Sequence, residues 1–348
     1  MRHLDLLKKV ILEVIVFLFL LLSVLWFIHN YYVNTSHIYQ PLDFTFLFEP
    51  SQFFINQAWY PIKADDSMMM IFLSGLLNTL VVSVAAIILS SLIGLVIGLL
   101  PFLQHNSFKS MNMKFVSLFR NVPLYIQLLT WYFGIFYQLP KPEHSLHFLH
   151  CFLNIKGLYF PSVFFTTMTY VLIVLLFIMF QVFKKHRLLI CFLGFFVCAF
   201  SLRFSFPTVD QNQVIHGYYL STEFLSLWLA LSFYSSAYIA EIIKGAIRSV
   251  PKGQFEGAKS LGLSFTQQYQ YIILPQALPI MRPVLTNQYI NIFKNSSLGA
   301  LIGYPELLGI TAGTMINQTS RNLEVMMITL CIYFGICQII TFLFRQDQ

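Results

Sequence analysis

The sequence predicts an all-α fold, a polytopic bundle of about eight membrane-spanning helices. Two observations carry this prediction. Of the 348 residues, 57% are hydrophobic and only 10% are charged, whereas soluble proteins carry about 25% charged residues. A chain so poor in charge cannot cover itself with water-compatible side chains, so its outer face must contact lipid. The apolar residues also gather in stretches of about 20, the length at which a helix crosses a bilayer.

Eight stretches are long and apolar enough to span the membrane. The first follows Arg2, Lys8 and Lys9, and its nineteen residues exceed the apolar core of a signal peptide, so we expect a retained anchor. Only the charged turn 184–187 separates the fourth stretch from the fifth, which makes these two a helical hairpin. The predicted spans are residues 10–28, 76–100, 115–136, 163–183, 188–206, 224–243, 278–302 and 325–344.

The net charge of +7 sets orientation and does not indicate nucleic acid, because the basic residues form short clusters between apolar runs. With the N-terminus in the cytoplasm, fifteen Lys and Arg residues fall inside and six fall outside or within spans, which favours eight spans with both termini cytoplasmic. Loops 30–70 and 138–162 are then external, and loop 248–277 is cytoplasmic. We expect two parts, 1–70 (an anchor and an external loop) and 71–348 (the main transmembrane domain, with the inserted hairpin 163–206).

No recognisable catalytic or cofactor site is present in the sequence. The phosphate-binding pattern GxxxxGK[ST] is absent, so the chain is not expected to bind ATP. The five cysteines form neither a paired framework nor a CxxC motif. His144, His147 and His150 lie close together in an external loop, but no second cluster completes a tetrahedral set, which favours a polar loop over a metal site. We expect no catalytic residue, no metal and no cofactor.

Polar residues in the seventh predicted span are candidates for a substrate path. Asn287, Asn291 and Asn295 recur at i, i+4 and i+8 and therefore share one helical face; Lys294 and Ser296 adjoin them. Such a face would line a polar cavity suited to a carboxylate. The alternative is that the asparagines hydrogen-bond neighbouring helices, but that role needs no lysine, and a charge at membrane depth costs at least about 2.5 kcal/mol.

A second polar set lies in the third predicted span and comprises Arg120, Asn121 and Gln127. Pro123 deprives the carbonyl near Phe119 of its helical partner, and Arg120 would pair with this carbonyl or extend toward the interface. A structural kink and a gate or site contact both fit these residues.

Closely spaced pairs in two other spans indicate packing. Glu241 and Lys244 lie three residues apart, so we favour a structural ion pair over a proton relay. Gly94 and Gly98 form a small-xxx-small step that lets two helices approach closely.

The cytoplasmic loop predicts two short helices. The first covers 254–261 and ends at Gly262, which fits the left-handed position after a helix. Ser264 and Gln267 form a capping box that opens a second helix through Leu274, and Pro275 is expected to stop it. Apolar residues on helices outside the bilayer need a covering surface. A partner protein and an interfacial position on lipid are the two alternatives.

The same loop combines Glu256, Gly257 and Ala258 with Gly262 and the run Ile272 to Pro275. At this spacing the loop resembles the EAA signature of permease subunits of bacterial ATP-binding-cassette importers. In that family the loop forms a coupling helix that sits in a cleft of the ATPase subunit. Gly257 stands where alanine is commoner, which would loosen the helix by at most about 1 kcal/mol. The matching residues are Glu256, Gly257, Ala258, Gly262, Ile272, Ile273, Leu274 and Pro275.

Further segments are similar to the polar-amino-acid branch of these permeases. Within that branch, residues 154–161, 294–298 and 302–307 resemble the general L-amino-acid permeases, which also carry an extra first span and an inserted hairpin. Aspartate often follows the lysine there, so Asn295 argues against a strictly cationic substrate. The other matching segments are residues 118–124, 238–245, 274–279 and 287–291.

The resemblance implies a permease subunit of an ATP-driven L-amino-acid importer in the cell's inner membrane. It implies three partners besides the lipid bilayer: ATPase subunits, a second homologous permease (a heterodimer, with a homodimer left open) and a periplasmic or extracellular amino-acid-binding protein. The main alternative is a stand-alone secondary transporter or channel for small polar solutes, which usually has intramembrane carboxylates and paired repeats. A membrane-bound enzyme ranks third, because no His/Asp/Glu cluster lies at membrane depth.

Overall fold

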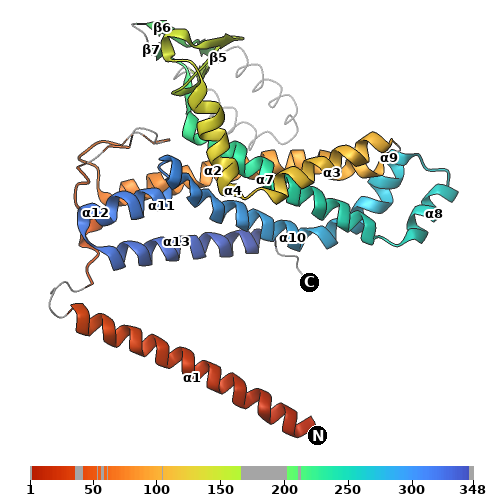
Figure 1. Ribbon diagram of the computed structural model, residues 1–348, viewed down its shortest axis with the longest axis horizontal. Helices are drawn as coiled ribbons and strands as arrows, with labels where there is room; N and C mark the ends of the chain where they lie inside the picture. Colours follow the sequence, from red (N-terminus) through yellow and green to blue (C-terminus); the bar gives the residue numbers. More distant parts are fainter. Residues whose placement is uncertain are drawn as a thin grey trace, which may run out of the picture. The chain divides into compact units, whose positions relative to one another are not determined.

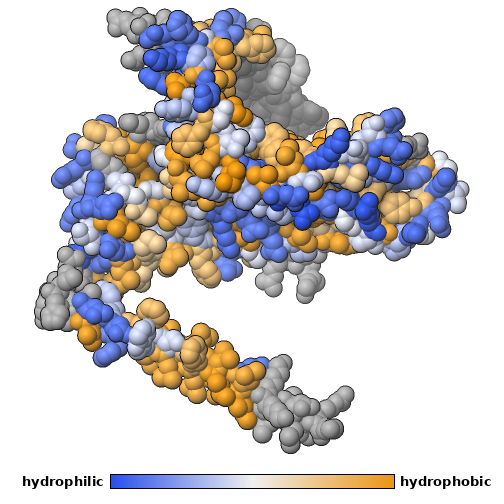
Figure 2. All heavy atoms as spheres, viewed as in Figure 1, coloured by the Kyte–Doolittle hydropathy of each residue, from blue (hydrophilic) through white to orange (hydrophobic). Residues whose placement is uncertain are grey.

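A computed structural model describes residues 2–35, 42–52, 54–55, 59–60, 62–103, 105–165, 202–210 and 213–344. The chain forms two units, Met1–Glu49 and Pro50–Gln348. The first unit contains α1 (Arg2–Thr35) and a short 3₁₀ turn, Thr45–Phe48. The stretch Ile11–Asn34 is apolar and unburied all round (Figure 2), so it suits a lipid environment.

The second unit is built around two helices, α2 (Met68–Leu99) and α7 (Thr222–Ser249), that pack along much of their length. Gly94 and Gly98 make this packing possible. A Cβ at Gly94 would lie 2.6 Å from Cγ2 of Ile239, and one at Gly98 would lie 2.9 Å from the carbonyl oxygen of Ala240. The small-xxx-small step is therefore a close helix contact, as the sequence predicts.

Two further long helices complete the bundle. α10 (Leu274–Asn295) packs against α7 and α13 (Asn322–Leu343). The short helices α8 (Lys252–Ser260) and α9 (Phe265–Gln268) lie at one end of the bundle, and α11 (Leu307–Ile310) and α12 (Ile316–Thr319) lie toward the other (Figure 1). We call these the loop end and the far end.

Helices long and apolar enough to cross a membrane confirm four predicted spans among the described residues: Ile11–Asn34, Met68–Phe102, Thr222–Ser249 and Asn322–Leu343. The third predicted span is not one helix. α3 (Asn106–Asn121) ends before Pro123, and α4 (Leu124–Leu129) then continues into a π-helical turn, Thr130–Ile135. The break follows from the missing N–H of proline and its exclusion of the α conformation from the preceding residue. The count of eight spans stays a prediction.

The seventh predicted span begins earlier and ends differently from the expectation. α10 starts at Leu274, carries Pro279 and Pro283 in its interior, and gives way to a 3₁₀ segment, Ser296–Ile302. Gly303 then adopts a left-handed conformation with φ of 79°, which reverses the chain. After α11 comes a second π-helical turn, Thr311–Met315.

Short strands cover the segments that flank the predicted hairpin, a β component that the all-α prediction omits. β1 to β3 and β8 form an antiparallel sheet in the order β1-β2-β3-β8, while β4 pairs with β5 and β6 with β7. β4 and β5 overlap the predicted fourth and fifth spans, whose ends are thus extended; their central parts lie outside the described residues. The strands are β1 Leu146–Phe148, β2 Cys151–Asn154, β3 Gly157–Phe160, β4 Ser162–Phe165, β5 Leu202–Ser205, β6 Thr208–Asp210, β7 Gln213–Ile215 and β8 Tyr218–Ser221.

Candidate functional site

The loop end begins with α8, whose C-terminus is closed by backbone hydrogen bonds. The N–H of Gly262 donates to the carbonyl of Lys259 at 3.0 Å, and the N–H of Leu263 donates to that of Ala258 at 3.3 Å. Together with a φ of 72° at Gly262, these two bonds make a Schellman motif. The predicted helix end at Gly262 is confirmed.

The second loop helix starts where the sequence predicts but does not stop at Pro275. The Ser264 side chain accepts from the N–H of Gln267, whose own side chain accepts from the N–H of Ser264, so the capping box is present. α9 then passes through a π-helical turn, Tyr269–Ile273, directly into α10. Pro275 lies in the first turn of α10, where a missing N–H costs little, so the predicted stop at this residue is wrong.

Tyr269 joins the loop helices to the bundle. Its ring centre lies 4.4 Å from that of Phe265 on α9, 6.0 Å from that of Phe102 after α2, and 6.4 Å from that of Phe255 on α8. Burial raises the pKa of the Tyr269 phenol, so this group stays neutral at physiological pH. Tyr269 thus contacts both loop helices and the segment that follows α2.

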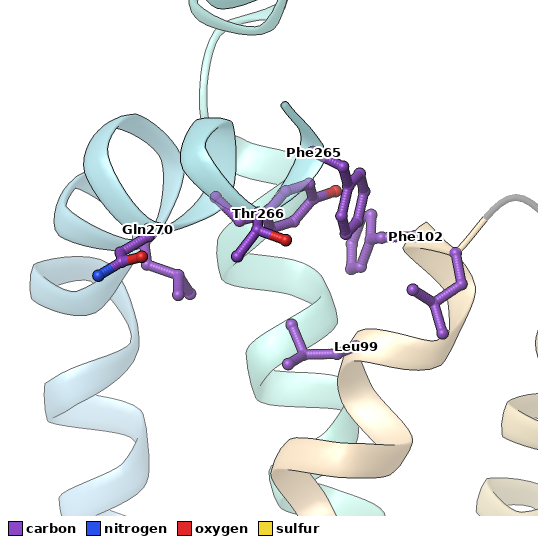
Figure 3. Close-up of a pocket in the computed structure, with 8 residues that line it drawn as sticks. Leu99, Phe102, Phe265, Thr266 and Gln270 are labelled. Carbon is purple, nitrogen blue, oxygen red and sulfur yellow. The ribbon is translucent and has the colours of Figure 1, made fainter. Parts of the chain in front are cut away.

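An apolar groove of about 210 Å³ lies beside this aromatic contact (Figure 3). One wall of the groove comes from the end of α2 and the residues just after it. The other wall comes from α9, from the turn that links α9 to α10, and from Leu274 at the start of α10. One further tie holds the loop, because the Gln276 side-chain amide donates to that of Gln254 across 3.1 Å. The lining residues are Leu99, Phe102, Leu103, Phe265, Thr266, Tyr269, Gln270 and Leu274.

The outward face of α8 is polar. Ala258 is only 1% exposed and packs inward, whereas Glu256 and Gly257 are exposed, and a Cβ at Gly257 would meet no atom within 4 Å. An interfacial helix on lipid would present a large apolar face instead. The polar surface of α8 therefore favours contact with a partner protein over contact with lipid. The exposed residues of α8 are Lys252, Gly253, Gln254, Glu256, Gly257, Lys259 and Ser260.

Three polar residues of α10 point away from its packing surface. Asn287, Asn291 and Lys294 are exposed on one side, while Ile292 and Phe293 are buried on the other. Within the described residues, no hydrogen bond reaches the side chains of this exposed set. Helix-to-helix hydrogen bonding inside this chain therefore does not explain Asn287 and Asn291.

α10 lies beside the middle of α2, which puts its exposed polar face at membrane depth. The phenol of Tyr289 is 3.1 Å from the hydroxyl of Ser91, which lies well inside the Met68–Phe102 span. Asn295 is half-buried at the last position of α10. Ser296 is buried and donates to the carbonyl of Phe293 at 2.7 Å, so it is occupied within the helix end. The exposed polar atoms at membrane depth thus come chiefly from Asn287, Asn291 and Lys294.

Of the second predicted polar set, Gln127 is structural, whereas Arg120 and Asn121 lie on the surface. Gln127 is buried, and its amide donates to the carbonyls of Phe119 at 2.8 Å and Val122 at 2.9 Å. Gln127 is therefore the partner of the Phe119 carbonyl, a role for which the sequence suggests Arg120. Arg120 and Asn121 are exposed, and the guanidinium of Arg120 lies 5.0 Å from the centre of the Tyr238 ring. α3 and α10 both pack on α7.

Comparison with known proteins places the chain in a family. Residues 90–346 match the model of the binding-protein-dependent transport system inner membrane component. The chain belongs to this family. As a permease it is a multi-pass component of the inner membrane that moves a solute and does not itself catalyse a reaction.

Two relatives match the permease over nearly its whole length. It is 34% identical to the putative amino-acid ABC transporter permease protein YhdX of Escherichia coli, over 91% of this chain and 87% of that protein. It is 32% identical to the general L-amino acid transport system permease protein AapQ of Rhizobium johnstonii, over 97% and 90%. A crystal structure of an amino acid ABC transporter with histidines shares the fold, with a TM-score of 0.50, 23% identity and coverage of 79% and 92%.

Sequence reasoning did not identify Glu306, a buried hydrogen-bonding residue at the far end of the permease. Glu306 is fully buried and accepts from the N–H groups of Leu308 at 2.8 Å and Gly309 at 2.5 Å, and from the phenol of Tyr333 at 3.3 Å. The neighbouring N–H of Leu307 donates to Thr79 at 2.9 Å, which ties α11 to α2. An acid directly before the apolar run of α11 is the N-cap signal that points to Glu306.

Two of the clustered histidines lie in one hairpin, His147 on β1 and His150 in the turn to β2. His147 stacks on Phe152, and His150 lies at a left-handed turn position with its ring 4.9 Å from that of Phe206. No group of three or more His, Cys, Asp or Glu side chains suited to a metal ion occurs in the described parts of the permease.

Proposed function

We propose that the permease is a subunit of an ATP-driven importer for L-amino acids. Both relatives that match it end to end are named as amino-acid permeases. The sequence lacks the GxxxxGK[ST] pattern, so ATP hydrolysis falls to separate ATPase subunits that drive alternation between outward-open and inward-open states.

The loop end carries this proposal. α8 presents a polar face headed by Glu256, while the Schellman motif, the capping box and Tyr269 hold it against the bundle. A rigid exposed element tied to membrane helices suits the transmission of ATPase closure. Glu256 and Gly257 form the contact segment, the buried Ala258 packs it against the rest of the permease, and Gly262, Leu274 and Pro275 fix its position.

The polar face of α10 supports a path shared with a second permease subunit. Lipid cannot cover Asn287, Asn291 and Lys294, because polar side chains at membrane depth require polar partners or water. A homologous subunit facing this side would enclose an aqueous route. General amino-acid systems combine two different permeases, so the proposal is a heterodimer, with Arg120, Asn121 and Asn295 on the same route.

Orientation follows from the basic residues. The loop end carries Lys252 and Lys259 and is placed in the cytoplasm with both termini. The strands β1 to β8 then face outward, where an amino-acid-binding protein would deliver the solute. Residues 71–348 would form the permease domain, with 1–70 as an added anchor and external loop.

Reconstitution tests the proposal. The chain is assembled with its ATPase, second permease and binding protein, and uptake of labelled L-amino acids is compared for wild type and Glu256→Lys. We expect ATPase-dependent uptake in wild type and loss of at least about 90% of it in the variant, because charge reversal opposes a buried docking contact. Glu143→Lys is the matched control, since it makes the same change at an exposed residue of the external segment.

Two outcomes contradict the proposal. Uptake that proceeds without any ATPase would indicate the rival, a secondary transporter or channel. Uptake that depends on ATPase but is unaffected by Glu256→Lys would remove Glu256 from the coupling contact. The rival also needs a free intramembrane carboxylate, whereas both oxygens of Glu306 already accept hydrogen bonds.

A further inference from the structure

A polar cleft of about 320 Å³ lies between α3 and α7. Its volume falls at the lower end of the range of about 300–1,000 Å³ that is usual for ligand pockets. One wall comes from α3 and the other from Glu241 and Lys244 of α7. The complete lining is Met113, Val116, Ser117, Arg120, Asn121, Glu241 and Lys244.

The cleft holds three charges, of which one is unmatched. Glu241 and Lys244 form an ion pair along α7, as the sequence predicts. Arg120 faces them from α3, and its neighbour is the face of the Tyr238 ring. In the described part of the chain, no carboxylate pairs with Arg120. The cleft therefore offers a cation without a counter-charge next to a carboxylate already shared with lysine.

Glu241 and Lys244 lie near the loop end of the membrane-spanning helices. Gly98, close to the end of the Met68–Phe102 span, packs against Ala240 and Ile243 on either side of Glu241. Asn112 of α3 donates to the carbonyl of Ile97 at 2.9 Å, and Arg120 lies about 12 Å further along that helix. Charges so close to apolar spans are costly to bury, so each is a candidate for a functional role.

We propose that this cleft binds the zwitterionic head of the transported amino acid, with the α-carboxylate against Arg120 and the α-ammonium facing Glu241. The proposal rests on the amino-acid import proposed above and adds a recognition site to it. The head group is common to all amino acids, and the rest of the lining is uncharged: Met113 and Val116 are apolar, and Ser117 and Asn121 are polar. A site of this kind admits solutes of many side chains while rejecting those that lack either charge.

The test uses the assembled transporter and three probes. The first probe is a labelled amino acid: L-glutamine, L-glutamate or L-alanine, whichever the wild type takes up fastest. The other two probes are unlabelled competitors, the α-amide and the N-acetyl derivative of that amino acid. The variants are Arg120→Gln and Glu241→Gln. Lys114→Gln is the matched control, because Lys114 is an exposed cation of α3 outside the cleft.

We expect each variant to lose one kind of discrimination. Arg120→Gln should lower kcat/KM for the amino acid roughly tenfold, the usual effect of losing one charge-assisted hydrogen bond, and should reduce the preference over the α-amide by a similar factor. Glu241→Gln should lower kcat/KM for the amino acid by a similar factor and reduce the preference for the amino acid over its N-acetyl derivative. Arg120→Lys should restore part of the preference over the amide, and Lys114→Gln should match wild type.

Equal losses for the amino acid and its derivatives, or no loss, would overturn the cleft as a binding site while leaving the import function intact. Absence of ATPase-dependent uptake in wild type would overturn both. Co-purification with the ATPase identifies a variant that fails to fold. If Arg120→Gln fails to fold, Arg120→Lys decides: a partial loss of the preference over the amide supports carboxylate binding at Arg120, whereas an unchanged preference, or equal losses for the amino acid and its amide, contradicts it.

Discussion

The backbone carbonyls next to Pro123 receive their hydrogen bonds from a side chain one turn further on. Gln127 donates to the carbonyls of Phe119 and Val122, so the break between α3 and α4 leaves neither of them unpaired. The kink is therefore a fixed structural feature of the permease. A buried polar side chain that satisfies two carbonyls is costly to replace.

We expect Gln127→Leu to destabilise the permease by about 1–3 kcal/mol, because two buried carbonyls would lose their donors. The measurement is the thermal midpoint of the detergent-solubilised protein. Gln138→Leu is the control, since Gln138 also donates to a carbonyl, that of Phe133, but is exposed. Equal midpoints for the two variants would show that Gln127 has no structural role.

At this scale the sequence identifies which carbonyl needs a partner but not which side chain supplies it. The rule that proline removes an N–H concerns only the backbone and leads directly to Phe119. The choice between Arg120 and Gln127 depends on which of them turns inward, and helical spacing alone does not settle it. Arg120 is exposed in the structure, and Gln127 is buried.

Among the elements, the loop of α8 and α9 is the part that local sequence rules predict best. Both ends of its turn use local chemistry: a left-handed glycine after α8 and a capping box before α9. The prediction fails at Pro275 because it assumes α-helical geometry, whereas the chain adopts a π-helical turn just before this residue. β4 and β5 are missed because their residues are as apolar as those of the predicted spans that they overlap.

We expect Gly262→Ala to weaken the loop by about 1–2 kcal/mol, the cost of a left-handed conformation for a residue with a Cβ. The measurement is hydrogen exchange at the amides of α8, which should become faster. Gly257→Ala is the matched control: the same change five residues earlier is helical and open to solvent, so exchange there should stay equal or slow down. Faster exchange in both variants, or in neither, would contradict the role of Gly262.

For the whole molecule, the orientation in the membrane can be tested at two residues of equal exposure. Leu149, in the β1–β2 turn, and Leu261, after α8, are each 75% exposed. In a cysteine-free background, Leu149→Cys should react with a membrane-impermeant maleimide in intact cells, and Leu261→Cys only after permeabilisation. Labelling of Leu261→Cys from outside would reverse the proposed topology.

The sequence predicts the membrane bundle and several of its helices because apolar length is a property of single segments. It does not predict how α3 and α7 enclose a cleft, since this requires packing between segments about a hundred residues apart. Glu241 and Lys244 were therefore interpreted as an isolated pair, although they line the same cleft as Arg120.

The π-helical turn Tyr269–Ile273 has a consequence for the rotational phase of α10. An α-helix turns by about 100° per residue, and a π-helical turn accommodates about one residue more than an α-helical turn does. Deleting one residue there would rotate α10 by roughly that angle relative to α8 and α9. Asn287, Asn291 and Lys294 would then swing from the open side toward the α7 and α13 packing surfaces. The length of this one turn thus sets the direction in which the polar face points while the loop end stays anchored.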